Sequence, residues 1–276
     1  MFDSEEYVEQ AYFFRVLSER MNQAMASQEV LSSLREEVLA TSKLPMAIDF
    51  LSGELRLHGV MSPAMAKLSH YFTPFQTFIF AEAEVEGGQF DLAIGLEILR
   101  REAEYRARGA TPQGMFLYQF ESISRNRLHY DRGMMAMAGD PIYDEDWRKW
   151  IQDVLRQLGL IDLADLIYVR SAHYEPQRAG KADKTAESLP PVLFGEKEGR
   201  IALAMRRKDP VLLFASMHRQ LGYPEVPQPK AAEQDQQRLD QVVRRMERLE
   251  ARLKLVEEEQ RGGIDLERFY ENPGGS

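Results

Sequence analysis

Three stretches of the chain combine a Ser or Thr, a proline and an apolar run, and each combination marks a helix start. A Ser or Thr hydroxyl accepts a hydrogen bond from the free backbone N–H groups at the beginning of a helix. Proline fits the first helical position because the N–H that it lacks would have no partner there. The repeated pattern therefore predicts several short helices. The three starts are Ser62-Pro63, Thr73-Pro74 and Thr111-Pro112.

Apolar residues recur every three or four positions through most of the first 175 residues, which is the spacing of one helix face. The predicted fold class is therefore mainly α, a multi-helix bundle of αα-hairpins. A helix is also expected from Asp209-Pro210 to Gly222. Besides the three starts above, helices are expected over residues 3–26, 27–39, 45 to 53 or 59, 88–109, and from Asp144 or Asp140-Pro141 to 158. Residues 160–174 fit a helix or a strand, and the helix is favoured.

One expected hairpin, between Phe80 and Gly109, resembles the turn of a tetratricopeptide-type helical hairpin. The residues that carry the resemblance are Gly88, Phe90 and Ala93. A repeat array would need the pattern to recur at about 34 residues, and the sequence from Ser122 onward does not repeat it. We therefore interpret the segment as an αα-hairpin inside a bundle.

A single helix is predicted from Thr111 to Gly133, with the glycine as its left-handed stop. Arg127 falls in the middle of the apolar face of this helix, and Asp131 lies one turn further on. A buried charge needs a partner, so the two side chains are expected to pair. Glu121 and Arg125 form a second pair at the same spacing on the outer side. The apolar face consists of Phe116, Phe120, Ile123, Tyr130 and Met134.

The polar residues of this helix allow two interpretations. In the favoured one, Arg127 and Asp131 are a buried ion pair that fixes how the helix packs. In the alternative, Arg127 binds a carboxylate or phosphate group, and His129 or Glu121 transfers protons. Glu121, Arg127, His129 and Asp131 are therefore the candidate catalytic residues.

Net charge and cysteine content restrict the function classes. The formal net charge of −9 argues against nucleic acid and against an anionic membrane surface as partners. The absence of cysteine excludes disulfide frameworks, thiolate metal sites and cysteine nucleophiles. No signal peptide is recognisable in the acidic first ten residues, and no apolar run approaches the ~18 residues that span a bilayer. We expect a cytoplasmic protein.

Motifs that mark common enzyme classes are missing. The five histidines are scattered and none stands in a zinc-binding pattern, and phosphate-loop, dinucleotide-binding and serine-hydrolase motifs are absent. No cofactor or metal site is expected. Asp144-Glu145-Asp146 is interpreted as an acidic helix start rather than a cation site, and Arg206-Arg207-Lys208 as a solvated cluster.

The region after residue 175 divides into shorter parts. Two apolar runs flank Glu196-Lys197-Glu198-Gly199, and this pattern predicts one small β-hairpin. The predicted organisation is a helical domain at 1–175, a flexible linker at 176–190, the β-hairpin and a helix packed on that domain at 191–222, a proline-rich linker at 223–234, a coiled-coil helix at 235–261 and a loose tail at 262–276.

The segment 235–261 has a coiled-coil seam, with apolar residues at alternating steps of three and four. In the seven-residue repeat, the positions beside the seam (g and e) carry arginine at each g and glutamate at two of the e positions. In a parallel pair each g position faces an e position of the partner helix, so opposite charges meet and parallel association is favoured. The alternatives are that this seam docks on the rest of the chain or on another protein. The seam consists of Leu239, Val242, Met246, Leu249, Leu253 and Val256.

These observations favour a non-enzymatic, cytoplasmic interaction or scaffold protein that self-associates through its C-terminal coiled coil. Its expected partners are further copies of the chain or another protein. The alternative function is an enzyme or small-anion-binding protein with a polar site around Arg127, Asp131 and Glu121.

Overall fold

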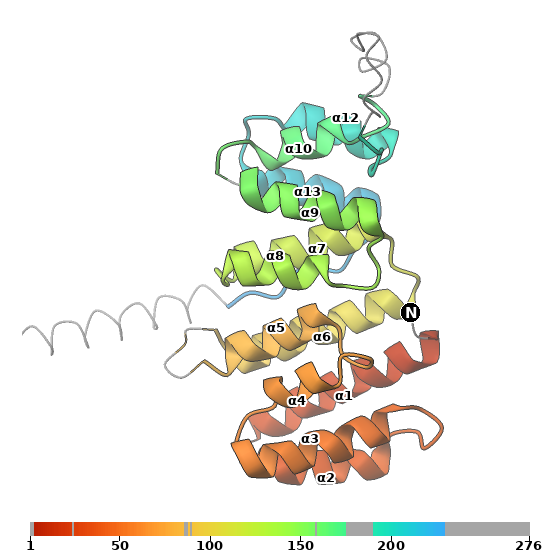
Figure 1. Ribbon diagram of the computed structural model, residues 1–276, viewed down its shortest axis with the longest axis vertical. Helices are drawn as coiled ribbons and strands as arrows, with labels where there is room; N and C mark the ends of the chain where they lie inside the picture. Colours follow the sequence, from red (N-terminus) through yellow and green to blue (C-terminus); the bar gives the residue numbers. More distant parts are fainter. Residues whose placement is uncertain are drawn as a thin grey trace, which may run out of the picture. The chain divides into compact units, whose positions relative to one another are not determined.

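A computed structural model describes residues 3–23, 25–85, 88, 90–157, 159–174 and 190–229 of the chain (Figure 1). The chain divides into two units, Met1–Gln228 and Pro229–Ser276. Only Pro229 of the second unit is described. The predicted coiled coil at 235–261, the tail at 262–276 and nearly all of the linker at 176–190 lie outside the described residues.

The described part of the first unit contains twelve α-helices and no β-sheet, so the predicted mainly α fold is confirmed. The helices lie in two rows that together form a stack (Figure 1). In stacking order, the first row is α2 (Ser27–Glu37), α1 (Ser4–Asn22), α6 (Leu92–Ala107), α7 (Pro112–Arg125), α13 (Pro210–Leu221) and α12 (Glu196–Met205). The second row is α3 (Leu44–His58), α4 (Ser62–Lys67), α5 (Pro74–Ala83), α8 (Tyr130–Ala138), α9 (Glu145–Gln157) and α10 (Leu163–Val169).

The order of helices in the stack departs from chain order at both ends. The first helix, α1, packs mainly on α6, while the α2–α3 hairpin occupies the end of the stack beyond it. At the other end α13 returns to pack on α7, inside α12. Most neighbouring helices of the stack are in contact, as in helical repeat proteins, but the chain does not simply progress from one end to the other.

The predicted helix starts are confirmed, with one difference in how they are capped. Thr73 forms a capping box with Gln76, and the Thr111 hydroxyl accepts a hydrogen bond from the backbone of Gly114. At α4 the cap comes from the residue that follows α5, because the Glu84 carboxylate accepts the backbone N–H groups of Met61 and Ser62 at 2.6 and 2.9 Å. A distant carboxylate therefore caps this short helix.

The predicted β-hairpin is wrong. Residues Glu196–Met205 form α12, and the only β interaction among the described residues is an isolated bridge between Ser171 and Phe194. Glu196 and Glu198 lie in the first turn of α12, where the helix dipole favours negative charge. Gly199, expected in a turn, instead permits close packing, because a Cβ there would lie 2.2 Å from Ser171 Oγ.

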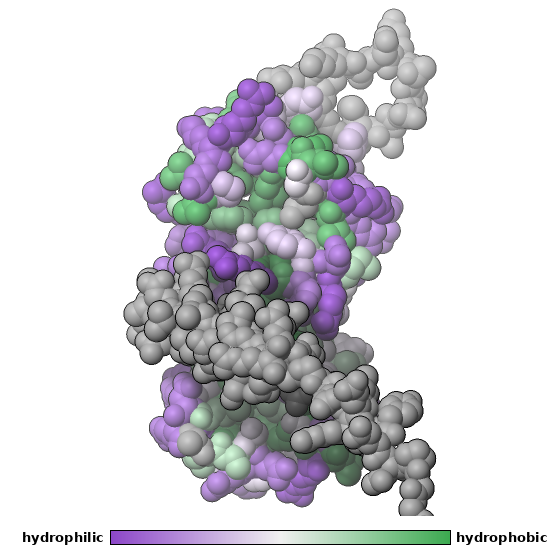
Figure 2. All heavy atoms as spheres, turned by 90° about the vertical axis from the view of Figure 1, so that its left-hand side faces the viewer, coloured by the Kyte–Doolittle hydropathy of each residue, from purple (hydrophilic) through white to green (hydrophobic). Residues whose placement is uncertain are grey.

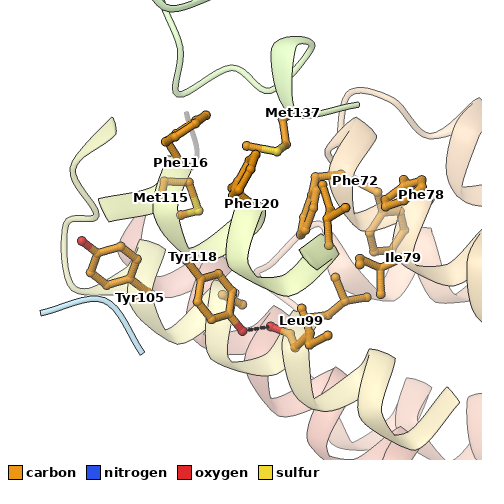
Figure 3. Close-up of a cluster of buried hydrophobic side chains, with 14 of the residues drawn as sticks. Phe72, Phe78, Ile79, Leu99, Tyr105, Met115, Phe116, Tyr118, Phe120 and Met137 are labelled. Carbon is orange, nitrogen blue, oxygen red and sulfur yellow. Dashed lines mark hydrogen bonds between the residues drawn. The ribbon is translucent and has the colours of Figure 1, made fainter. Parts of the chain in front are cut away.

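The buried hydrophobic side chains form one continuous core along the described part of the stack. Figure 3 shows its central part, where Phe116 and Phe120 of α7 lie beside Met137 of α8. The ring centroid of Phe116 is also 4.7 Å from that of Trp150 on α9, so aromatic packing joins successive layers. On the surface, Figure 2 shows hydrophobic side chains in separate patches among hydrophilic ones at the end formed by α10, α12 and α13. None of the described helices combines the length and apolarity needed to cross a bilayer.

Candidate functional site: a groove that holds an extended segment

The predicted helix from Thr111 to Gly133 is two helices, and this changes the candidate site. α7 ends at Arg125, Arg127 adopts a left-handed φ of 54°, and α8 begins at Tyr130. The backbone N–H of Leu128 bonds to Ile123 O, and that of Arg127 bonds to Ser124 O. This is a Schellman motif with Arg127 at the position that is usually glycine, so the sequence lacked the normal stop signal.

The four candidate catalytic residues do not come together. Arg127, His129 and Asp131 are exposed, and no salt bridge joins Arg127 to Asp131 in the described part of the chain. The interpretation of these two residues as a buried ion pair is therefore wrong. Only Glu121 is buried, at 5% exposure, and it does pair with Arg125 at 2.5 Å as predicted.

Glu121 lies on a surface formed by α6, α7 and α13, here called the groove, against which the protein's own chain packs. After α13 the residues 222–228, here called the extended segment, contain no regular secondary structure and run across these helices (Figure 1). Tyr223 and Val226 of the extended segment are buried, at 1% and 5% exposure. The segment therefore contributes to the hydrophobic core.

Polar groups of the groove bind both the side chains and the backbone of the extended segment. The Tyr223 phenol lies 2.9 Å from Glu121 Oε2 and 3.0 Å from the backbone oxygen of Phe214. Arg101 Nη1 donates to the carbonyl of Glu225 at 2.7 Å, and Asn126 Nδ2 donates to that of Pro227 at 3.0 Å. The backbone bonds recognise an extended conformation, and the tyrosine bonds add side-chain specificity.

Burial and charge both act on the tyrosine at this site. Burial raises the pKa of the Tyr223 phenol, and the neighbouring Glu121 carboxylate raises it further. The phenol therefore stays protonated and can donate. Beside it, a pocket of about 340 Å³ is bordered by both the groove and the segment. Its polar lining includes Glu121, Arg125, His218, Arg219 and Glu225.

His129 belongs to a different cluster, which joins α5 to α8. The buried Glu82 carboxylate lies 2.7 Å from His129 Nδ1 and 3.3 Å from Arg132 Nη1. It also accepts the backbone N–H of His129 at 3.3 Å. Glu82 therefore supplies the negative charge at the start of α8 that His129, the N-cap residue, does not provide.

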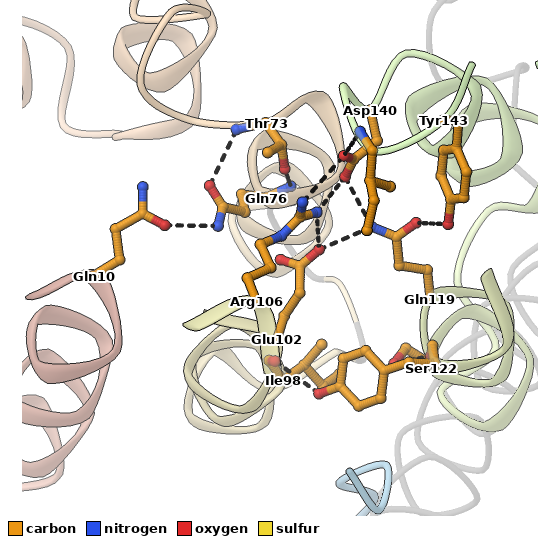
Figure 4. Close-up of polar contacts among 12 residues, drawn as sticks. Gln10, Thr73, Gln76, Ile98, Glu102, Arg106, Gln119, Ser122, Asp140 and Tyr143 are labelled. Atoms are coloured by element: carbon orange, nitrogen blue, oxygen red, sulfur yellow. Dashed lines mark hydrogen bonds and ion pairs between the residues drawn. The ribbon is translucent and has the colours of Figure 1, made fainter. Parts of the chain in front are cut away.

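A third polar cluster is sealed inside the stack (Figure 4). Arg106 of α6 contacts Asp140 through both terminal nitrogens and Glu102 at 2.8 Å. Gln119 of α7 donates to both carboxylates, and the Tyr143 phenol donates to Gln119 at 2.9 Å. All five side chains are at least 95% buried. The cluster links successive layers of the stack and offers no access to a substrate.

The charges of this sealed cluster do not balance if both carboxyl groups ionise. Burial raises the pKa of Glu102, and the Asp140 charge adds to that effect. Burial alone would lower the pKa of Arg106, but the two carboxyl groups hold it above its ordinary value. Burial therefore favours the neutral form of Glu102 although the Arg106 charge opposes it, and the carboxyl groups favour the charged form of Arg106. The i, i+4 spacing of Glu102 and Arg106 was the only local signal for this cluster.

The described residues hold no group of three or more His, Asp or Glu side chains placed to bind a metal ion. Asp144 caps α9 by accepting the backbone N–H of Trp147 at 2.9 Å, consistent with the expected helix start. Arg206 forms an ion pair with Asp165. Comparison of the chain with protein-family models, curated proteins and solved structures finds no match.

Proposed function

We propose that this chain is a non-enzymatic, cytoplasmic interaction scaffold whose helical stack binds extended peptide segments and whose C-terminal part self-associates. The observation that carries the proposal is the groove between α6, α7 and α13. It already holds one extended segment through its backbone carbonyls and a buried tyrosine. A surface with these contacts has the chemistry of a peptide-binding site.

The groove can be tested with a peptide spanning residues 219–229. In the wild-type chain the tethered segment competes at a high effective concentration, so a labelled peptide should not enter. In full-length Tyr223→Ala/Val226→Ala the occupied positions are weakened, and we expect the peptide to raise fluorescence anisotropy. A peptide with the same two alanines is the matched control. A folded double variant that does not bind the wild-type peptide would contradict peptide binding in the groove.

Self-association is proposed to use the seam from Leu239 to Val256. Its flanking charges favour a parallel arrangement, with Arg245 facing Glu250 of a second copy. The seam residues occupy the two core positions of the seven-residue repeat, called a and d. Leucine at a together with β-branched valine at d favours assemblies larger than dimers. Each exposed ion pair contributes only ~0.2–1 kcal/mol, so the charges select orientation and the apolar seam supplies affinity.

Light scattering of the full chain tests this part of the proposal. We expect a mass above that of a monomer, a lower mass for Leu249→Lys/Leu253→Lys, and no change for Lys254→Gln, which lies outside the seam. Truncation after Gln228 should lower the mass in the same way. A monomeric full chain at tens of micromolar would show that the seam does not drive self-association.

A second candidate function, a small-anion-binding protein, keeps one supporting observation. Of the residues Arg127, Asp131 and Glu121, only Glu121 lines the 340 Å³ pocket, but Arg125, His218 and Arg219 line it as well. If this pocket binds an anion, inorganic phosphate should raise the melting temperature of the wild-type chain and not that of Arg219→Gln. An equal shift for both proteins would argue against the site.

A further inference from the structure

The α2–α3 end of the stack carries an apolar stripe on its outer surface. On α3, Met46, Phe50, Gly53 and Leu57 follow one another at steps of four, three and four, so they lie along one helix face. Met46 and Leu57 are 71% and 74% exposed, and Phe50 is 36% exposed. The opposite face of α3 is buried in the core. The stripe is therefore a second apolar face, which the fold of the described residues does not use.

An apolar stripe is unusual at this place. The terminal layers of stacked helical proteins normally have a polar outer face, because nothing continues the stack beyond them. Here the middle of the stripe is also flat, since no heavy atom lies within 4 Å of where a Gly53 Cβ would be. A flat glycine between larger apolar side chains lets another helix approach closely.

We propose that this face binds the same face of a second copy, with the two α3 helices antiparallel. The proposal is independent of the groove and of the C-terminal seam. In this arrangement Phe50 of each copy lies over Gly53 of the other, and Met46 lies beside Leu57 of the other. The stripe is therefore complementary to itself in shape, as a two-fold symmetric interface requires.

The charges beside the stripe fit the same arrangement. Asp49 and Arg56 flank the stripe on one side of α3, and both are exposed. Within one copy Asp49 also forms an exposed ion pair with Arg35 of α2 at 3.1 Å, so the partner's Arg56 would join this pair. A two-fold axis across antiparallel helices keeps this side of one helix next to the same side of the other. Asp49 of each copy then lies within reach of Arg56 of the other copy, giving two ion pairs. Parallel helices would not bring the two flanks together in this way.

Cross-linking tests the register of this interface directly, because the chain has no cysteine of its own. Full-length Met46→Cys and Leu57→Cys proteins, mixed and oxidised, should form a disulfide-linked heterodimer. Each protein alone should not form a disulfide-linked homodimer. In such a homodimer the cysteines of the two copies would lie 11 helical positions, or roughly 16 Å, apart along the interface. A disulfide needs Cα atoms within ~7 Å. Ser32→Cys on the exposed side of α2 is the control for random collision.

The charge pairs allow a second, independent test. In the mixed cysteine proteins, Arg56→Glu places two carboxylates opposite each other and should slow cross-linking about tenfold. The exchange Asp49→Lys/Arg56→Glu should restore it. Cross-linking of Met46→Cys with itself, equal cross-linking of Ser32→Cys, or no heterodimer at tens of micromolar would each overturn the proposal. All of these positions are exposed, so circular dichroism should show unchanged helicity.

Discussion

The phenol oxygen of Tyr223 lies 2.9 Å from a carboxylate oxygen of Glu121, although 102 positions separate the two residues in the chain. The other oxygen of that carboxylate is 2.5 Å from Arg125 Nε. Glu121 therefore makes one contact within α7, with Arg125, and one contact from α7 to Tyr223 of the extended segment. Through this residue, the segment that precedes the C-terminal unit is fixed to the middle of the helical stack.

We expect Tyr223→Phe to lower the free energy of unfolding by about 1–3 kcal/mol, because it leaves a buried carboxylate oxygen without its donor. Tyr12→Phe is the matched control. Its phenol also bonds to a glutamate, Glu37, at 2.9 Å, but in an exposed position. The control should change stability by no more than about 0.5 kcal/mol. Urea unfolding followed by circular dichroism measures both, and equal losses would contradict the assigned role of Tyr223.

Helix starts could be predicted from the sequence because their chemistry is local. Thr73, Thr111 and Asp209 each cap a helix through a backbone group two or three positions away. The contact between Tyr223 and Glu121 could not be predicted, because it depends on how the stack brings distant segments together. The same holds for α4, whose cap comes from Glu84.

Two sequence predictions failed because a residue took an uncommon role. Arg127 occupies a left-handed position for which glycine is the usual signal, so the end of α7 was missed. Gly199 suggested a turn, but it serves close packing against Ser171 inside α12. At Gly199 tertiary packing overrides the local preference of the residue.

The left-handed conformation of Arg127 leads to a prediction at that position. A residue with a Cβ costs about 1–2 kcal/mol there, whereas glycine adopts this conformation freely. We therefore expect Arg127→Gly to be more stable than Arg127→Ala by roughly 1 kcal/mol, and Arg127→Ala to lie close to wild type because the side chain is exposed. Thermal unfolding of the three proteins measures the order. A large loss in Arg127→Ala would instead point to a paired charge.

Two helical glycines should respond in opposite ways to alanine. A Cβ at Gly133 would lie 2.7 Å from Ile123 Cδ1 and 3.0 Å from Phe78 Cζ, so Gly133→Ala should cost about 1–3 kcal/mol through overpacking. At Gly53 a Cβ meets open space, and Gly53→Ala should add about 0.4–1 kcal/mol by restricting the unfolded chain. Chemical unfolding at low protein concentration checks both signs. A stabilised Gly133→Ala would mean that α8 can move away from α5 and α7.

The sealed cluster around Arg106 makes stability depend on pH in a defined direction. Burial raises the pKa of Glu102 in the folded protein, so on raising the pH the unfolded chain loses this proton first. The contribution of protonated Glu102 is complete below its unfolded pKa of about 4.3 and is lost as pH rises toward the folded value. Glu102→Gln keeps the group neutral and removes this loss.

We therefore expect Glu102→Gln to match or exceed wild-type stability at pH 7, with the advantage shrinking as the pH falls toward 4. An amide oxygen can still accept the bonds from Arg106 and Gln119 at Oε1. The amide nitrogen then takes the place of Oε2, which has no hydrogen-bond partner among the described residues, so it meets the same environment as the proton of a neutral Glu102. Asp140→Asn is the contrasting variant, because it removes the carboxylate that contacts both terminal nitrogens of Arg106. Breaking a buried pair costs ~3–5 kcal/mol, so Asp140→Asn should destabilise strongly at pH 7. Urea titrations at several pH values decide the question, and a Glu102→Gln protein that loses as much stability as Asp140→Asn would show that Glu102 is ionised in the folded chain.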